Sequence, residues 1–175
     1  MRHTISVLVE NRYGELARIV ELFSARGYNI ESLTVAETLD SSVSRLTVVT
    51  SGDDRTIQQI VRQLKRLVRV LEVTDLNGFE RVERETVLLN VAISNHAALQ
   101  QLMPLVSENQ IRVVEVMADG VIVEATAEWA QIREIVQKLT ALGIRGMART
   151  GTVALAKHMP QTSDVIVRPA ETTTS

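Results

Sequence analysis

The fold of this chain is set by the stretch from Ile5 to Ser24, which reads ISVLVENRYGELARIVELFS. Its first five residues are rich in β-branched side chains, which favours a β-strand. After a polar loop, apolar residues recur at the spacing i, i+3, i+4, i+7, at Leu16, Ile19, Val20 and Phe23. This spacing places the four side chains on one stripe of a helix, as in a helix that lies on a sheet. The opening of the chain therefore predicts a strand, a loop and a helix, in that order.

The same helical spacing occurs three more times, in stripes that begin at Ile57, Leu99 and Ile132. Runs rich in β-branched residues lie between the helices, at 32–36, 43–50, 68–73, 86–93, 111–117, 121–125 and 153–156. The predicted elements therefore follow the order β-α-β-β-α-β, and this order occurs twice along the chain. It predicts an α+β protein with two ferredoxin-like domains in tandem, each an antiparallel sheet with helices on one face.

Composition supplies the domain limits. The polar stretch from Gly78 to Arg84 separates the two repeats, so we expect an N-terminal domain over 1–78 and a C-terminal domain over 79–159. The residues from Pro160 onward have little periodicity and contain two prolines. They predict a flexible tail over 160–175.

The overall composition excludes several classes of protein. The chain has 175 residues, with 19 Lys and Arg against 21 Asp and Glu, which gives a net charge of −2. It has no cysteine, which excludes disulfides and thiolate metal sites. No apolar run is long enough to cross a membrane, and the first residues do not predict a secretory signal. We expect a cytoplasmic protein that binds neither membrane nor nucleic acid.

A sheet with helices on one face leaves its other face uncovered. Leu8, Leu46 and Val48 are predicted to alternate onto that second face, where a small domain would expose them to water. Open edge strands carry a similar risk of unwanted pairing. Both features predict a homodimer.

A search for catalytic chemistry finds no residue set that could perform it. The chain lacks phosphate-binding glycine motifs, and its three histidines, His3, His96 and His158, lack carboxylates at metal-ligand spacing. We expect each histidine to lie at the surface. Five basic residues lie on or just after the second helix, Arg55, Arg62, Lys65, Arg66 and Arg69. We interpret them as a solvated face, because no aromatic residues alternate with them to stack on bases.

The loop before the first helix is different. A strand, a glycine-containing loop and a helix start would expose backbone N–H groups at the positive end of the helix dipole, where a carboxylate binds well. After the helix, the segment from Arg26 to Ile30 supplies an amide side chain at Asn29. The residues alone leave a second interpretation open, in which Gly14 only forms a turn and the asparagines only cap backbone groups.

Two segments of this region resemble a known family. The sequence ISVLVEN at 5–11, followed by Gly14 and Leu16, and the sequence RGYNIESLTVA at 26–36 resemble the regulatory small subunit of acetohydroxyacid synthase, also called acetolactate synthase. Weaker matches occur at VERE (82–85) and ARTG (148–151). The resemblance covers about residues 3–157.

This resemblance implies an N-terminal ACT domain, which is the amino-acid-sensing version of the βαββαβ unit, followed by an ACT-like domain. It also implies small-subunit dimers that bind a separate catalytic large subunit, and this partner carries thiamine diphosphate, magnesium and FAD. The chain itself would then have no cofactor, metal or catalytic residue. A branched-chain amino acid, usually valine, would bind between two ACT domains. The matching positions are Asn11, Gly14, Glu15 and Leu16 from one protomer, with Asn29 and Ile30 from the other.

Position 15 departs from the family, in which it is often small and apolar. Glu15 places a negative charge beside the expected ligand carboxylate, so the direction of its side chain decides whether the site survives. An alternative function is a free-standing ACT-type sensor that acts on transcription, and the basic second helix is its one support. Co-purification of a large thiamine-diphosphate enzyme or of DNA would separate the two hypotheses.

Overall fold

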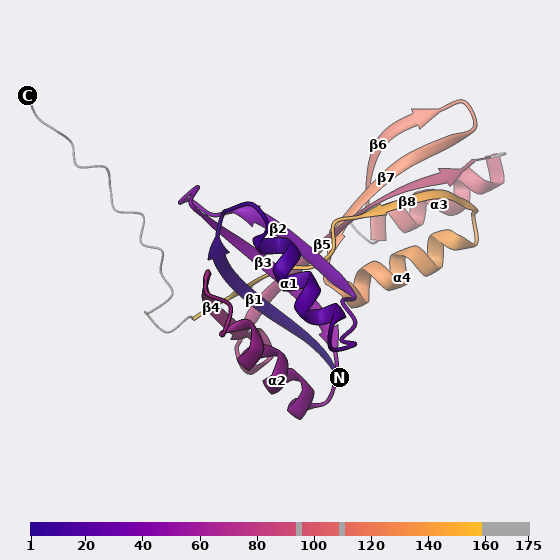
Figure 1. Cartoon of the computed structure of the whole chain (residues 1–175). Coiled ribbons are helices and arrows are strands. Elements are labelled where there is room, and N and C mark those ends of the chain that lie inside the picture. The colour runs from indigo at the N-terminus through magenta and orange to yellow at the C-terminus, as the bar shows by residue number, and fades with distance from the viewer. Residues whose placement is uncertain (94–95, 109–110, 159–175) are drawn as a thin grey trace, which may run out of the picture. The chain divides into compact units, whose positions relative to one another are not determined.

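The computed structural model describes residues 1–93, 96–108 and 111–158 (Figure 1). The chain divides into two compact units. Unit 1 comprises Met1–Val82 together with the chain from Ala154, and unit 2 comprises Glu83–Val153. The tail expected over 160–175 lies outside the described residues.

Unit 1 has one antiparallel sheet in the strand order β2-β3-β1-β4, with two helices. Its elements are β1 (Arg2–Glu10), α1 (Glu15–Ser24), β2 (Ser32–Glu37), β3 (Val43–Ser51), α2 (Asp54–Leu64), β4 (Val70–Asp75) and the short 3-10 helix η1 (Leu76–Gly78). The order of elements is βαββαβ, as the periodicity predicts. Helix α2 begins where it does because the Asp53 carboxylate accepts a hydrogen bond from the Thr56 amide at 2.7 Å.

The core of unit 1 lies between the sheet and the two helices. Alternate residues of β1, namely Ile5, Val7 and Val9, pack there against Ile19, Phe23, Ile57 and Ile60 of the helices. Leu46 and Val48 belong to this same core, so the prediction that they lie on the uncovered face is wrong. The strand register explains the error, because Val48 lies opposite Ile5 and Leu46 lies opposite Val7. Leu8 lies opposite Arg45, on the other side of the pleat.

Unit 2 repeats the arrangement, with a sheet order β6-β7-β5-β8. Its elements are β5 (Arg81–Ala92), α3 (His96–Glu108), β6 (Arg112–Met117), β7 (Gly120–Ala127), α4 (Trp129–Thr140) and β8 (Ile144–Arg149). The last strand of the chain, β9 (Val153–Ala156), lies in unit 1 from Ala154 onward. Together the two sheets confirm the α+β fold of tandem ACT-type units. The core of unit 2 is aliphatic, like that of unit 1, and includes Val87, Leu89, Ile132 and Leu139.

The last strand of the second sheet differs from the sequence prediction. We expected 153–156 to close the βαββαβ unit, but the strand that does so is β8, over Ile144–Arg149. Its sequence, IRGMAR, contains one β-branched residue and a glycine, so its β signal is weak. Strand β9 is an additional strand that pairs with β5. Its Ala154 and Ala156 pack against Leu76, and the Lys157 amide donates to the Glu80 carbonyl at 2.8 Å.

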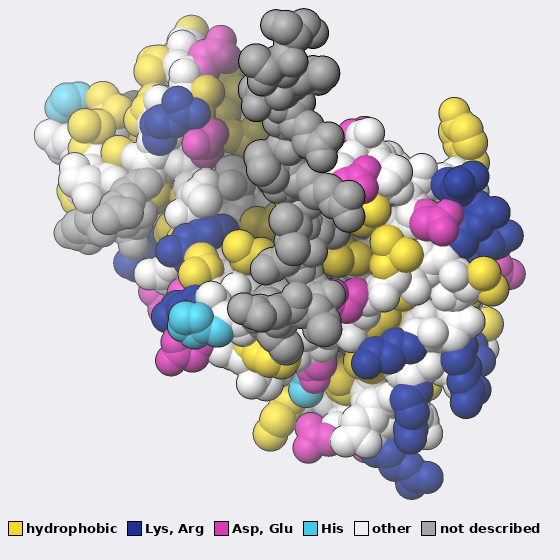
Figure 2. Space-filling model, turned by 90° about the vertical axis from the view of Figure 1, so that its left-hand side faces the viewer, with side chains coloured by type: hydrophobic (Ala, Val, Ile, Leu, Met, Phe, Trp, Pro, Cys, Tyr) yellow, Lys and Arg dark blue, Asp and Glu magenta, His cyan; other side chains and the backbone are white. Residues whose placement is uncertain are grey.

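Among the described residues, no helix is both long enough and apolar enough to cross a membrane. The same part of the chain holds no group of His, Cys, Asp or Glu that could bind a metal ion. Figure 2 shows basic, acidic and hydrophobic side chains mixed over the surface, with Lys and Arg gathered on the right-hand side of the view.

Candidate functional site

The loop from β1 into α1 turns at Gly14. This residue has φ 86° and ψ −10°, a left-handed conformation that suits glycine. It occupies the N-cap position of α1 and makes no side-chain capping bond. The Glu15 amide donates to the Arg12 carbonyl at 3.3 Å. The next two amides, of Leu16 and Ala17, lie in the first turn, where a helix has no partners of its own for them. The start of α1 therefore offers N–H donors and a positive dipole end to an anion.

The Glu15 carboxylate is neutralised by two arginines. Its side chain is 5% exposed, and its Oε1 lies 3.0 Å from Nη1 of Arg18 and 3.5 Å from Nη1 of Arg69. Arg18 is on the same helix, whereas Arg69 precedes β4. The negative charge of Glu15, the residue that departs from the family pattern, is therefore buried in unit 1 and paired with two positive charges.

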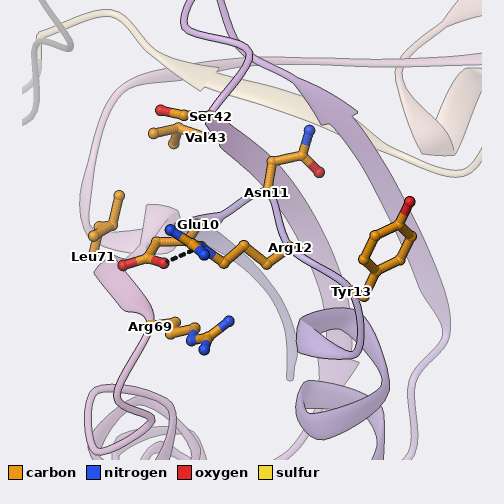
Figure 3. A pocket seen from close by; sticks show the side chains of 8 residues that line it. All are labelled: Glu10, Asn11, Arg12, Tyr13, Ser42, Val43, Arg69 and Leu71. Atoms are coloured by element: carbon orange, nitrogen blue, oxygen red, sulfur yellow. Dashed lines mark ion pairs between the residues drawn. The ribbon is translucent and has the colours of Figure 1, made fainter.

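A hollow of about 970 Å³ opens beside this loop (Figure 3). It is lined by Glu10, Asn11, Arg12, Tyr13, Ser42, Val43, Arg69 and Leu71. Arg12 reaches back to Glu10, with 2.9 Å between its Nε and the carboxylate Oε2. Of the six site residues implied by the family resemblance, Asn11 is the one that lines the hollow.

Asn11 joins the β1–α1 loop to the β2–β3 loop. Its Nδ2 donates to the Ser41 carbonyl at 2.9 Å, and its backbone amide donates to the Ser42 carbonyl at 2.7 Å. Ser42 is itself held by Asp40, whose carboxylate accepts from the Ser42 hydroxyl at 2.6 Å and from its amide at 2.9 Å. Both hydrogen bonds lower the pKa of Asp40, and the bond from the hydroxyl has the larger effect. Among the described residues, the side-chain Oδ1 of Asn11 accepts no hydrogen bond and is available to a ligand.

Asn29 and Ile30 lie at the other end of α1. The Asn29 carbonyl accepts from the Thr50 hydroxyl at 2.6 Å, and Ile30 packs partly buried against the core of unit 1. Helix α1 has 10 residues, so its two ends are about 15 Å apart. One copy of the chain therefore does not bring these two residues beside Gly14.

Sequence reasoning missed three residues around the loop, Arg12, Tyr13 and Arg69. The structure places Arg69 beyond the end of α2, where it reaches Glu15, so its assignment to a basic helical face is wrong. Tyr13 is fully exposed at the edge of the hollow. Arg12 and Tyr13 directly precede Gly14, and this position in the loop is the one sequence signal that they lie near the site. The contact of Arg69 with Glu15 has no local sequence signal.

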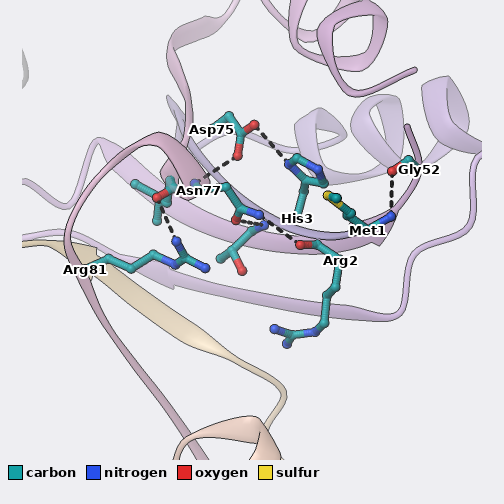
Figure 4. Close-up of polar contacts among 9 residues, drawn as sticks. Met1, Arg2, His3, Gly52, Asp75, Asn77 and Arg81 are labelled. Atoms are coloured by element: carbon teal, nitrogen blue, oxygen red, sulfur yellow. Dashed lines mark hydrogen bonds and ion pairs between the residues drawn. The ribbon is translucent and has the colours of Figure 1, made fainter. Parts of the chain in front are cut away.

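A second polar cluster lies at the opposite end of β1 (Figure 4). His3 is 7% exposed, and its Nδ1 lies 3.1 Å from a carboxylate oxygen of Asp75, so the expectation of a surface position is wrong for this histidine. His96 and His158 are exposed, as expected. The Thr4 amide donates to Asn77 Oδ1 at 3.1 Å, and the Asn77 amide donates to the Asp75 carboxylate at 3.0 Å. The cluster ties β1 to the end of β4 and is structural.

Comparisons with known proteins match both halves of the chain. Residues 5–72 match the family described as the AHAS small subunit-like ACT domain, and residues 84–158 match the small subunit of acetolactate synthase. The chain is 39% identical over 158 residues to the acetolactate synthase small subunit of Aquifex aeolicus, covering 90% of this chain and 82% of that protein. It is 38% identical over 160 residues to a probable acetolactate synthase small subunit of Archaeoglobus fulgidus, covering 90% and 98%. A crystal structure of the acetolactate synthase small subunit from Thermotoga maritima superposes with a TM-score of 0.81 at 34% identity, covering 91% and 99%.

Proposed function

The chain belongs to the acetolactate synthase small-subunit family, and on that basis we propose that it activates a separate catalytic subunit and makes that subunit sensitive to feedback inhibition by valine. In this proposal the chain performs no catalysis. The catalytic subunit makes 2-acetolactate from pyruvate, or 2-aceto-2-hydroxybutyrate from pyruvate and 2-oxobutyrate, and it holds the thiamine diphosphate, magnesium and FAD.

The observation that carries the proposal is the uncapped start of α1 at Gly14. The free amides of the first turn suit the carboxylate of an amino acid. The Oδ1 of Asn11, and an amide oxygen from Asn29 of a second copy, suit its ammonium group. Leu16 is 39% exposed and offers an apolar contact for an aliphatic side chain. Glu15 is already paired with two arginines, and their positive charges reduce its repulsion of the ligand carboxylate.

A homodimer would bring together the two groups of proposed site residues, those around Gly14 in one copy and Asn29 with Ile30 in the other. Strand β2 ends the sheet order and leaves one edge open. Strands β1 and β2 are parallel, because each is antiparallel to β3. The start of β2, and with it Asn29 and Ile30, is therefore at the sheet end opposite to the β1–α1 loop. Antiparallel pairing of β2 with β2 of a second copy would bring the second copy's Asn29 and Ile30 to the same end as Gly14.

The surface that would contact the catalytic subunit is a further part of the proposal, and we place it at Arg149, Thr150 and Gly151 of unit 2. The Arg149 side chain is held in place by an ion pair, since its Nε lies 2.7 Å from the buried carboxylate of Glu85. Thr150 is exposed and follows directly after β8. An exposed segment held by a partly buried ion pair is a suitable fixed contact for a partner.

Reconstitution tests this function. The purified chain is mixed with the catalytic subunit from the same organism, and acetolactate formation is measured for each subunit alone and for the mixture, with and without valine. We expect no product from the chain alone, higher activity in the mixture, and inhibition by valine that depends on the chain. Acetolactate formed by the chain alone, or a mixture no more active than the catalytic subunit, would contradict the proposal.

The variant Asn29→Ala tests the position of the site. The Asn29 side chain makes no hydrogen bond within the described residues, so its loss should leave the fold unchanged. Loss of a hydrogen bond to a charged ligand should raise the valine concentration for half-inhibition about tenfold or more, while activation stays normal. Gln58→Ala, an exposed position on α2, is the matched control and should behave as the wild type.

A further inference from the structure

A second hollow, of about 390 Å³, lies on unit 1 between the end of α1 and the last two turns of α2. Its lining is Arg26, Tyr28, Gln59, Arg62, Gln63 and Arg66. Three of these six side chains are guanidinium groups, two are amides and none is a carboxylate. The lining residues are not those proposed above for valine.

No acid among the described residues pairs with the arginines of this hollow. Arg26 donates to Gln63 Oε1 at 3.3 Å, and the Tyr28 hydroxyl donates to Gln59 Oε1 at 3.4 Å. These bonds orient both amides and fix the position of Arg26 beside α2. Within the part of the chain that the structure describes, Arg62 and Arg66 make no ion pair, whereas Arg18 and Arg69 share Glu15.

We propose that this hollow binds the phosphoryl group of a small phosphorylated ligand. Each guanidinium presents a planar fork of N–H donors that matches two oxygens of an anion. A carboxylate has two oxygens and is satisfied by one or two forks, whereas a phosphoryl group has three terminal oxygens and accepts from all three arginines. The amide nitrogens of Gln59 and Gln63 add neutral donors. The volume suits a small molecule, since ligand pockets begin at about 300 Å³.

The helix dipoles oppose this binding but do not cancel it. Both helices end near the hollow, and each C-terminus contributes roughly half a negative charge. Three guanidinium groups outweigh this contribution and leave roughly two net positive charges at the hollow. Arg26 and Arg62 are 36 residues apart in the sequence, yet both line this hollow. Arginines that serve only solubility would not need to gather in one place from separate segments.

Calorimetric titration of the purified full chain tests the proposal, at about 0.15 M ionic strength so that diffuse attraction is screened. The probes are inorganic phosphate, pyrophosphate and glycerol 3-phosphate, with citrate as a carboxylate of similar charge. We expect saturable binding of the phosphoryl probes and clearly weaker binding of citrate. Tighter binding of glycerol 3-phosphate than of phosphate would support an organic phosphate as the ligand, and the reverse order would support the free anion.

Two double variants separate the site from general charge. In Arg62→Gln with Arg66→Gln, pyrophosphate affinity should fall about tenfold or more, because two charge-assisted contacts are lost. Arg55→Gln with Lys65→Gln removes the same charge from α2 and its C-cap, outside the hollow, and should change affinity less than threefold. No binding by the wild type, equal losses in both double variants, equal affinity for citrate, or tighter binding of a DNA duplex than of pyrophosphate would each overturn the proposal. No catalytic subunit or valine takes part, so this result is independent of the function proposed above.

Discussion

Substitution of Gly14 by aspartate should weaken the valine response while keeping activation of the catalytic subunit. A Cβ at Gly14 would meet no atom within 4 Å, so aspartate fits in space, and its cost to the fold comes from φ 86° alone. Its carboxylate would lie about 4 Å from a ligand carboxylate at the start of α1. Two like charges at that distance repel by about 1 kcal/mol in water and about 4 kcal/mol near a protein surface. Valine affinity should therefore fall by roughly fivefold to a thousandfold.

Gly14→Asn is the matched control, because asparagine has the shape of aspartate without its charge and tolerates the left-handed conformation. Any competition of the new side chain for the first-turn amides is similar in both variants. The assay is a valine titration of acetolactate formation by the reconstituted enzyme, with the melting temperature of each chain measured in parallel. Equal half-inhibition concentrations for the two variants would show that no ligand carboxylate binds at this turn, and the placement of the site would have to be abandoned.

Three further outcomes are expected. Sedimentation of the chain at micromolar concentration should give about twice the monomer mass of 19.4 kDa, and a monomer at that concentration would refute pairing through β2. Glu15→Gln should destabilise the chain by about 1–3 kcal/mol in thermal or urea unfolding, because two arginines lose a buried partner, whereas Glu21→Gln on the exposed side of α1 should have little effect. Hydrogen bonds from Thr56, through its side chain and then its backbone, lower the pKa of Asp53 in the folded state below its usual 3.8. The stabilisation from Asp53 should be complete well above that value and disappear as the pH falls through the lower folded pKa, so the melting temperatures of wild type and Asp53→Ala should converge in acid and differ at pH 7.

The sequence alone determined the order of elements, because that order depends on local periodicity. The four helical stripes and most of the strands follow from which residues are apolar within short windows, and Asp53 marks its helix start through one local hydrogen bond. The glycine turn at the end of β1 was also predictable, since the left-handed conformation favours glycine. Strand β8 was missed because its residues carry little β propensity of their own, and pairing with β5 compensates for this.

Only the tertiary structure decided which side chains meet across long separations in sequence. Strand β3 has apolar residues on both of its faces, so its register with β1 was needed to place Leu46 and Val48 beneath the helices. The pairing of Glu15 with Arg69 and the burial of His3 against Asp75 join residues 54 and 72 positions apart, and no local pattern encodes such contacts. The same holds for the two ends of α1. The sequence names residues at both ends, but only the length of the folded helix shows that a single chain keeps them about 15 Å apart.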